Sequence, residues 1–297
     1  RDALLDLSNP RFGIREHAMA AIVNGLSLSK LRAFGAALFI FSGYARPAVR
    51  LDGAIDVRDG TLDLRVSGSI SQNSGAILAR RLTGSATGYV RLDGANGIAS
   101  LGALTAGGLL LNNAGALGID GIVDGGAGSV TIRARGGMTI GTAGAVRSAV
   151  AGDGITLASD GLLRNLAGGS ALSADNGRWL VYTQAAGNAG ASDPANDFGG
   201  LAGRSFYGAA YDFATGSFGA APNAGNRFVY GYRPVLTVLP NNIVVTYDGQ
   251  VPVLGASVTG LINGDRAADA WSGVASLSGA GRNARTPRIM TLEAPLS

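Results

Sequence analysis

The sequence predicts an all-β protein built as a right-handed parallel β-helix (solenoid), followed by a small, incomplete β module. Short triplets of the form apolar-x-apolar recur through the middle of the chain, and Gly, Asn, Asp and Ser separate them. The 297 residues include 48 Gly but only 9 Pro and no Cys. Period-two alternation over such short stretches is typical of strands, and its repetition at a spacing of about 20 residues or more indicates a solenoid.

The repeats occupy residues 49–184, which we assign to the β-helix. The last residues of successive triplets are about 28, 19, 21, 25 and 24 residues apart. The triplets are Leu62-Asp63-Leu64, Val90-Arg91-Leu92, Leu109-Leu110-Leu111, Val130-Thr131-Ile132, Ile155-Thr156-Leu157 and Trp179-Leu180-Val181. Secondary apolar stretches at residues 119–123 and 136–140 lie between them. We therefore expect two or three short strands per turn, each turn stacking on the next at roughly 4.8 Å.

Residues 1–48 differ from the repeats in composition. They contain the single His17 and the single Lys30 of the chain, and an apolar run at residues 33–41 follows Lys30. The run is too short to span a bilayer as a helix. Residues 30–45 fit the core of a secretory signal, although about thirty residues precede it, and a buried helix or strand is the alternative.

Residues 185–233 are rich in Gly and aromatic residues. Exposed aromatic rings can stack on sugars, which makes Phe206, Tyr207, Tyr211 and Phe213 candidate ligand contacts. The alternative, which we favour, is that this segment folds over the open end of the β-helix, because an uncapped stack exposes unpaired strand edges.

The residues offer little catalytic or metal-binding chemistry, so we expect no enzyme, no cofactor and no metal. His17 lies outside the repeats, and neither a Gly-x-Ser-x-Gly elbow nor a repeated calcium-binding nonapeptide occurs. Paired acids, as in polysaccharide-cleaving β-helices, are the remaining enzymatic possibility. The candidate acids are Asp52, Asp56, Asp59, Asp63, Asp93, Asp120, Asp124, Asp153 and Asp160, and most precede a Gly as turn residues do.

The net charge of +4 does not indicate nucleic-acid binding. The arginines are scattered singly along the chain, whereas a nucleic-acid-binding face normally clusters its cations. We expect no nucleic-acid partner.

Several stretches of the sequence resemble filamentous haemagglutinin-like exoproteins. These are SISQNSGAILA at residues 69–79, LTGS at 82–85, NGI at 96–98 and DNGRWLVY at 175–182. Downstream, FVY at 228–230, PVLTV at 234–238, TYDG at 246–249 and VTGLINGD at 258–265 resemble the start of a YDG or MBG-type module, which we place at residues 234–297. The residues after 283 do not match that module, so its C-terminal end is atypical and the chain is expected to be a fragment.

The resemblance implies a role rather than a reaction. It implies a structural and adhesive segment of a secreted protein on the surface of a Gram-negative bacterium, exported by an outer-membrane partner in two-partner secretion. Its partners would be host or neighbouring cell surfaces, including their glycans. Two other functions stay open: a β-helical carbohydrate-active enzyme, and an inert spacer that holds a distant toxin or binding tip.

Overall fold

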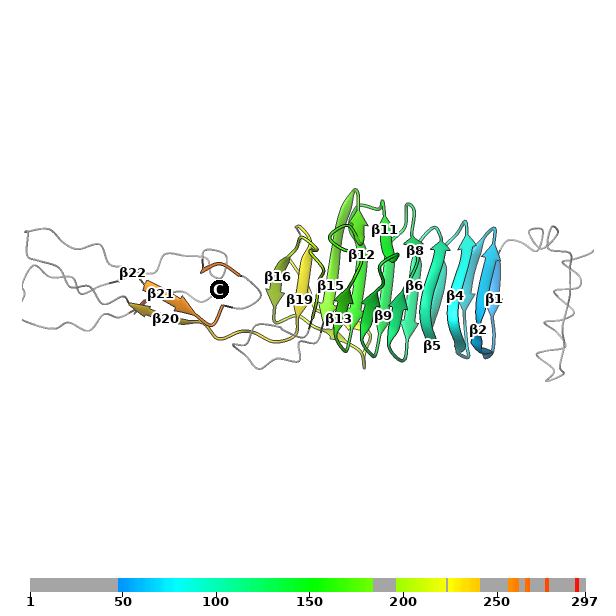
Figure 1. The fold of residues 1–297 in the computed structure, drawn as a ribbon, viewed down its shortest axis with the longest axis horizontal. Coiled ribbons are helices and arrows are strands. Elements are labelled where there is room, and N and C mark those ends of the chain that lie inside the picture. The colour runs from blue at the N-terminus through cyan, green and yellow to red at the C-terminus, as the bar shows by residue number, and fades with distance from the viewer. Residues whose placement is uncertain are drawn as a thin grey trace, which may run out of the picture.

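The computed structural model describes residues 48–183, 196–222, 224–240, 256–261, 265–267, 276–277 and 292–293. These residues form an all-β parallel β-helix of about eight turns, followed by short antiparallel strand pairs (Figure 1). The parallel β-helix predicted from the sequence is confirmed. The signal-like run at residues 30–45 lies outside the described residues, and its interpretation stays a prediction.

One wall of the β-helix, called sheet A, takes one strand from each coil, and all of its strands are parallel. In spatial order they are β1 (Ala48–Leu51), β3 (Ser69–Gln72), residues 90–96 of β5 (Val90–Thr105), β6 (Leu109–Asn113), β9 (Val130–Ala134), β12 (Gly152–Ser159), β15 (Gly177–Thr183), β19 (Arg227–Tyr230) and β16 (Arg204–Tyr207). Sequence order and spatial order differ only at the end, where β19 lies between β15 and β16.

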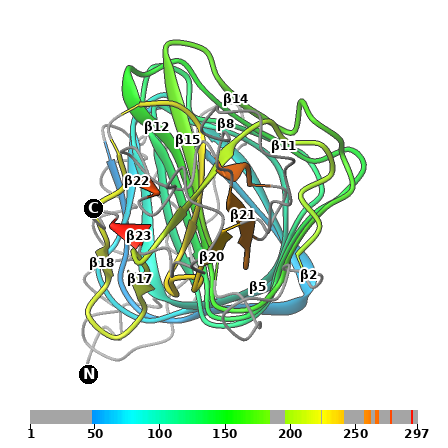
Figure 2. The same ribbon diagram turned by 90° about the vertical axis from the view of Figure 1, so that its left-hand side faces the viewer.

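The remaining strands of the coils form sheet B, which is also parallel. It begins with β2 (Ile55–Val66), β4 (Ile77–Ala86) and residues 97–105 of β5. In the later coils the long strand is replaced by two short ones: β7 (Leu117–Ile119) and β8 (Ile122–Asp124), then β10 (Met138–Ile140) and β11 (Ala145–Ser148), then β13 (Leu163–Asn165) and β14 (Leu172–Ala174). Figure 2 shows the coils from the end, lying one behind another.

The interior is built from columns of apolar side chains that stack in register. The last residues of five predicted triplets form one such column and are fully buried: Leu92, Leu111, Ile132, Leu157 and Val181. Each additional coil therefore buries another layer of apolar surface, which is the main stabilising contribution in a stack of this kind.

The first predicted triplet lies on a different wall from the other five. Leu62-Asp63-Leu64 lies in β2 of sheet B, and Gln72 of β3 follows Leu51 in the sheet A column instead. The period-two pattern shows which side chains point inward, but both walls share it, so it does not show the wall to which a strand belongs. This difference in wall explains the long first step of the predicted repeat.

Glycine is required at some corners because successive coils approach each other closely. A Cβ atom on Gly128 would lie 2.1 Å from the carbonyl oxygen of Gly107 in the preceding coil. Gly126, in the same corner, has a φ of 53°, a conformation that favours glycine, and the side chain of Asp124 accepts a hydrogen bond from its N–H at 2.8 Å. The corner thus uses glycine both for space and for conformation.

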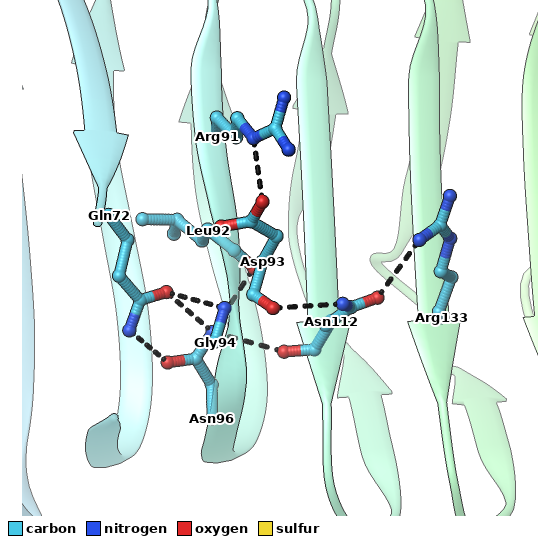
Figure 3. A network of polar contacts seen from close by, with 8 residues as sticks. All are labelled: Gln72, Arg91, Leu92, Asp93, Gly94, Asn96, Asn112 and Arg133. Carbon is cyan, nitrogen blue, oxygen red and sulfur yellow. Dashed lines mark hydrogen bonds and ion pairs between the residues drawn. The ribbon is translucent and has the colours of Figure 1, made fainter. Parts of the chain in front are cut away.

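A short row of buried amides satisfies backbone groups at the corner that follows sheet A. Asn96 accepts a hydrogen bond from the N–H of Ile77 at 2.8 Å, and Asn113 accepts one from the N–H of Ile98 at 2.8 Å. Asn96 also exchanges two hydrogen bonds with the side chain of Gln72, at 2.9 and 3.0 Å (Figure 3). Because an unpaired buried N–H is costly, these side chains let the chain turn inside a dry core.

The β-helix is followed by antiparallel pairs rather than further coils. Strand β20 (Thr237–Pro240) pairs with β21 (Ala256–Thr259), and β22 (Ser276–Leu277) pairs with β23 (Leu292–Glu293). The β module placed at residues 234–297 stays a prediction. Residues 246–249 and most of the atypical C-terminal end lie outside the described residues.

Replacing Leu111 with Ala should lower the free energy of unfolding by about 2–5 kcal/mol, because its side chain is fully buried between Leu92 and Ile132 and the cavity cannot close completely. Urea denaturation of the full chain, followed by circular dichroism, measures the change. The matched control is Thr131→Ala, on the outward side of β9, for which a change within about 0.5 kcal/mol is expected. Equal effects of the two substitutions would contradict the column arrangement.

Candidate functional site

The aromatic segment after the repeats forms a small hairpin on the outside of the β-helix. Its strands are β17 (Tyr211–Asp212) and β18 (Ser217–Phe218), which pair antiparallel. The carboxylate of Asp212 accepts hydrogen bonds from the N–H of Ala214 at 2.8 Å and from the hydroxyl of Thr215 at 2.7 Å. These bonds, with that of Thr215 the stronger cause, hold the pKa of Asp212 below its usual value and fix the turn.

The hairpin packs against the outer face of sheet A, as Figure 2 shows at the side of the coils. Phe213 and Phe218 lie against a second apolar cluster, which is separate from the interior and is made of Ala158, Leu180, Tyr182, Ala209, Tyr211 and Val229. Strand β15 is consequently buried on both faces. The uninterrupted apolar run Trp179-Leu180-Val181-Tyr182 is the sequence signal for this second buried face, because a strand with one solvated face alternates.

The prediction that the aromatic rings fold over the open end is therefore wrong for the hairpin, whose rings cover the flank. Two other rings of the segment pack against the interior instead. Phe198 stacks on Phe228 with ring centroids 3.9 Å apart, and Tyr207 stacks on Tyr230 at 5.3 Å, both continuing the interior toward the end of the stack. The segment 185–233 thus both extends the interior and covers one side.

Two arginines of β9 and the corner after it hold the hairpin in place. The guanidinium of Arg133 lies 5.2 Å from the ring centroid of Tyr211 and 5.1 Å from that of Phe218. Arg135 lies 5.9 Å from the ring of Phe213 and donates a hydrogen bond to its carbonyl oxygen. Cation–π contacts of this kind are worth roughly 0.5–2 kcal/mol each, depending on exposure.

A groove of about 220 Å³ lies between the hairpin and the outer face of the earlier coils. Its lining comes from β5 and β6 with their corners, from β9, and from the hairpin: Asp93, Gly94, Ala95, Asn112, Asn113, Ala114, Arg133, Arg135, Tyr211 and Phe213. Two of the predicted ligand contacts, Tyr211 and Phe213, line it. The other two do not, because Phe206 packs against the second apolar cluster and Tyr207 stacks on Tyr230.

The polar side of the groove is ordered by a network of hydrogen bonds (Figure 3). Asp93 accepts a bond from Nε of Arg91 at 2.6 Å, and the backbone oxygen of Asp93 accepts one from the side chain of Asn112 at 3.0 Å. The backbone oxygen of Asn112 accepts a bond from buried Asn96 at 3.1 Å. The groove is thereby connected to the amide row of the interior.

The sequence did not identify Asn112, Arg133 or Arg135 as site residues. Arg135 and Phe213 are 78 positions apart, and they meet only because the hairpin docks sideways on coils formed much earlier in the chain. In the sequence, each arginine is simply an outward polar residue in or beside a strand, and nothing near it indicates contact with a distant hairpin.

Five of the nine candidate acids make ion pairs with arginines, and Asp124 accepts a hydrogen bond within its own turn. Asp56, Asp63, Asp93 and Asp153 make ion pairs with Arg58, Arg65, Arg91 and Arg178 at 3.0, 2.8, 2.6 and 2.5 Å. Across the strand pairs, Asp63 faces Thr83, Asp153 faces Arg178 and Asp124 faces Arg147. None of these partners is an acid, so these strand pairs place no two carboxylates opposite each other.

Within the described part of the chain, no three His, Cys, Asp or Glu side chains come together as a metal site would require. No helix in the same residues is long and apolar enough to cross a membrane.

Replacing Tyr182 with Phe tests the packing of the hairpin. The hydroxyl of Tyr182 donates to the carbonyl of Gly219 at 2.8 Å, and burial raises its pKa, with Asp153 adding to the rise and Arg178 opposing it. Its contribution to stability is therefore complete below the usual tyrosine pKa and is lost as the pH rises through the higher folded value. In an alkaline titration of phenolate absorbance, Tyr182→Phe should remove a step that lies above the usual tyrosine pKa. It should also cost about 0.5–1.5 kcal/mol of stability at neutral pH.

Tyr89→Phe is the matched control for this titration, because the Tyr89 side chain is exposed. It should leave the raised step of Tyr182 in place. A titration above the usual tyrosine pKa that is unchanged in Tyr182→Phe would show that the hairpin does not bury this ring.

Comparisons with known proteins concern the N-terminal part of the chain. The family model for the transketolase pyrimidine-binding domain matches residues 6–69. Transketolase of Treponema pallidum (strain Nichols) is 66% identical over 41 residues, and that of Bacillus subtilis (strain 168) is 56% identical over 41 residues; each match covers 14% of this chain and 6% of the relative. Transketolase of Halalkalibacterium halodurans is 54% identical over 44 residues, which are 14% of this chain and 7% of the relative.

The chain therefore spans only a small share of these relatives. No solved structure matches it. The matched residues include most of the N-terminal segment that composition sets apart, and continue through β1 and β2 into the beginning of β3. The chain is thus similar to transketolases at its N-terminal side, and its described residues form a parallel β-helix from β1 to β19.

Proposed function

We propose that the β-helix is a structural and adhesive segment of a large secreted bacterial exoprotein of the filamentous haemagglutinin kind, which attaches the cell to host or neighbouring surfaces. The observation that carries the proposal is the continuous stack: the strands of sheet A pair parallel from coil to coil, and the column from Leu92 to Val181 is fully buried. Such a stack is stiff and can be lengthened by adding coils.

The location and the export partner belong to the same proposal. We place the protein outside a Gram-negative cell and assign its export to an outer-membrane partner in two-partner secretion, on the resemblance of the repeats. The chain has no Cys, which is compatible with a stack that relies on packing and backbone hydrogen bonds in any redox environment.

Transketolase activity is a second candidate, which the match at residues 6–69 favours. The relatives with that name are much longer proteins, and this chain matches only 6–7% of their length. Residues 48–69 of the match contribute strands to the β-helix, where their neighbours are other coils. We therefore rank the adhesive function first.

The adhesive proposal is tested by incubating the purified full chain with immobilised polysaccharides and with bacterial and epithelial cell surfaces. Retained protein, released sugar and transketolase activity are all measured. The proposal expects retention without sugar release. Release of sugar would instead support a β-helical carbohydrate-active enzyme, transketolase turnover would support the second candidate, and an inert spacer would give none of these signals.

A further inference from the structure

We infer that the groove between the hairpin and the outer face of sheet A binds an acidic saccharide, with its carboxylate at Arg133 and Arg135 and a sugar ring against Phe213. The inference rests on the proposed adhesive function and names the chemical class of ligand for it. The groove is lined by polar, charged and aromatic side chains, the combination that fixes the orientation of a small ligand.

Charge selects an anionic ligand. Arg133 and Arg135 line the groove, and Arg91 lies beside it, paired with Asp93. Three positive charges and one negative charge leave an excess of two positive charges at the groove. The carboxylate of Asp93 is already engaged by Arg91. Among the residues that the structure describes, the guanidinium groups of Arg133 and Arg135 make no ion pair with a carboxylate.

Arg133 also has unused hydrogen-bonding capacity. Its Nε is buried and makes no hydrogen bond within the described residues, and its contact with Asn112 is long, at 3.4 Å. A buried donor without a partner is costly, and a bond between a guanidinium and a carboxylate is among the strongest that a side chain can make. The buried Nε is not accessible to a ligand, but the terminal nitrogens of Arg133, whose bond to Asn112 is long, can bind a carboxylate.

The aromatic wall supplies the apolar contact that a sugar ring needs. Phe213 is only partly buried, and its ring meets that of Tyr211 edge-on with centroids 4.5 Å apart. Tyr211 in turn packs against the Phe218 ring and the Arg133 guanidinium, and these contacts fix the position of the two aromatic rings that line the groove. A face of Phe213 can thus receive the C–H face of a sugar while the arginines hold its acidic group.

The size of the groove limits the ligand that it holds. Its volume of about 220 Å³ is below the roughly 300–1,000 Å³ of clefts that enclose a drug-sized ligand. The groove therefore accommodates only a short segment of a longer polysaccharide, whose remaining sugars would lie outside it. The network through Asn112 and Asn96 sets the positions of its polar groups before any ligand arrives (Figure 3).

The test uses the full chain and three immobilised polymers: polygalacturonate, neutral dextran and double-stranded DNA. We expect the wild type to bind polygalacturonate in preference to both others, and less tightly as salt increases. Arg135→Gln should weaken binding to polygalacturonate about tenfold or more, since a hydrogen bond between charged groups is lost. Phe213→Ala should weaken it through the loss of the sugar contact.

Arg147→Gln is the matched control, because Arg147 is exposed on sheet B, away from the hairpin. It should bind as the wild type does. Arg135 and Arg147 are both exposed, so neither substitution removes a buried side chain, and thermal unfolding of each variant checks that its fold is kept.

Arg133→Gln is not used, since Arg133 contacts both strands of the hairpin through Tyr211 and Phe218. Arg135 also contacts the hairpin, at Phe213, so Arg135→Lys, which keeps the charge, is a second variant. It should bind polygalacturonate more tightly than Arg135→Gln does, and equal losses in the two variants would contradict a role for this charge.

Several results would overturn the inference. These are no binding of polygalacturonate by the wild type, equal binding of dextran, tighter binding of DNA, or an equal loss in Arg147→Gln and Arg135→Gln. Binding of cell surfaces that is unaffected by Arg135→Gln and Phe213→Ala would reject the groove and keep the adhesive function. Binding of neither cell surfaces nor any polysaccharide would reject both.

Discussion

Hydrogen bonding of each coil to the next along the axis is the constraint on which the rest of the molecule depends. Parallel pairing fixes the spacing of coils at roughly 4.8 Å and places equivalent residues above one another. The apolar columns follow from this register, as does the need for glycine at Gly128, where the preceding coil leaves no room for a side chain. At the other corner, the backbone leaves sheet A and its N–H groups need new hydrogen-bond acceptors. The buried side chains of Asn96 and Asn113 supply them.

The same register determines where a ligand site can form. One outward column of sheet A runs from Asn112 through Arg133, Ala158 and Tyr182 to Val229. It is polar in the earlier coils and becomes apolar toward β19. The hairpin covers the apolar part, and its edge reaches the polar part, so a groove with one aromatic side and one charged side arises at the boundary. The site is therefore a consequence of a change in composition along a single column.

The sequence was sufficient for the interior and insufficient for the exterior. Triplets such as Leu109-Leu110-Leu111 identify the inward positions, because alternation reflects burial on one face. The wall to which Leu62 and Leu64 belong, and the flank on which Tyr211 and Phe213 dock, depend on contacts between distant segments, which a local pattern does not contain. The composition separated residues 1–48 from the repeats, but a short apolar run alone gave no indication of the similarity to transketolases.

The position of β19 between β15 and β16 makes the order of assembly different from the order of the chain. Every earlier strand of sheet A can add to a neighbour that has already been made, so the stack can grow as the chain emerges. Strand β16 cannot, because its only partner in the sheet, among the described residues, is β19, which comes about twenty residues later. The last coils are therefore completed together, when residues 204–230 close as one unit, and a chain interrupted before Arg227 would keep β15 as an open, growth-competent edge.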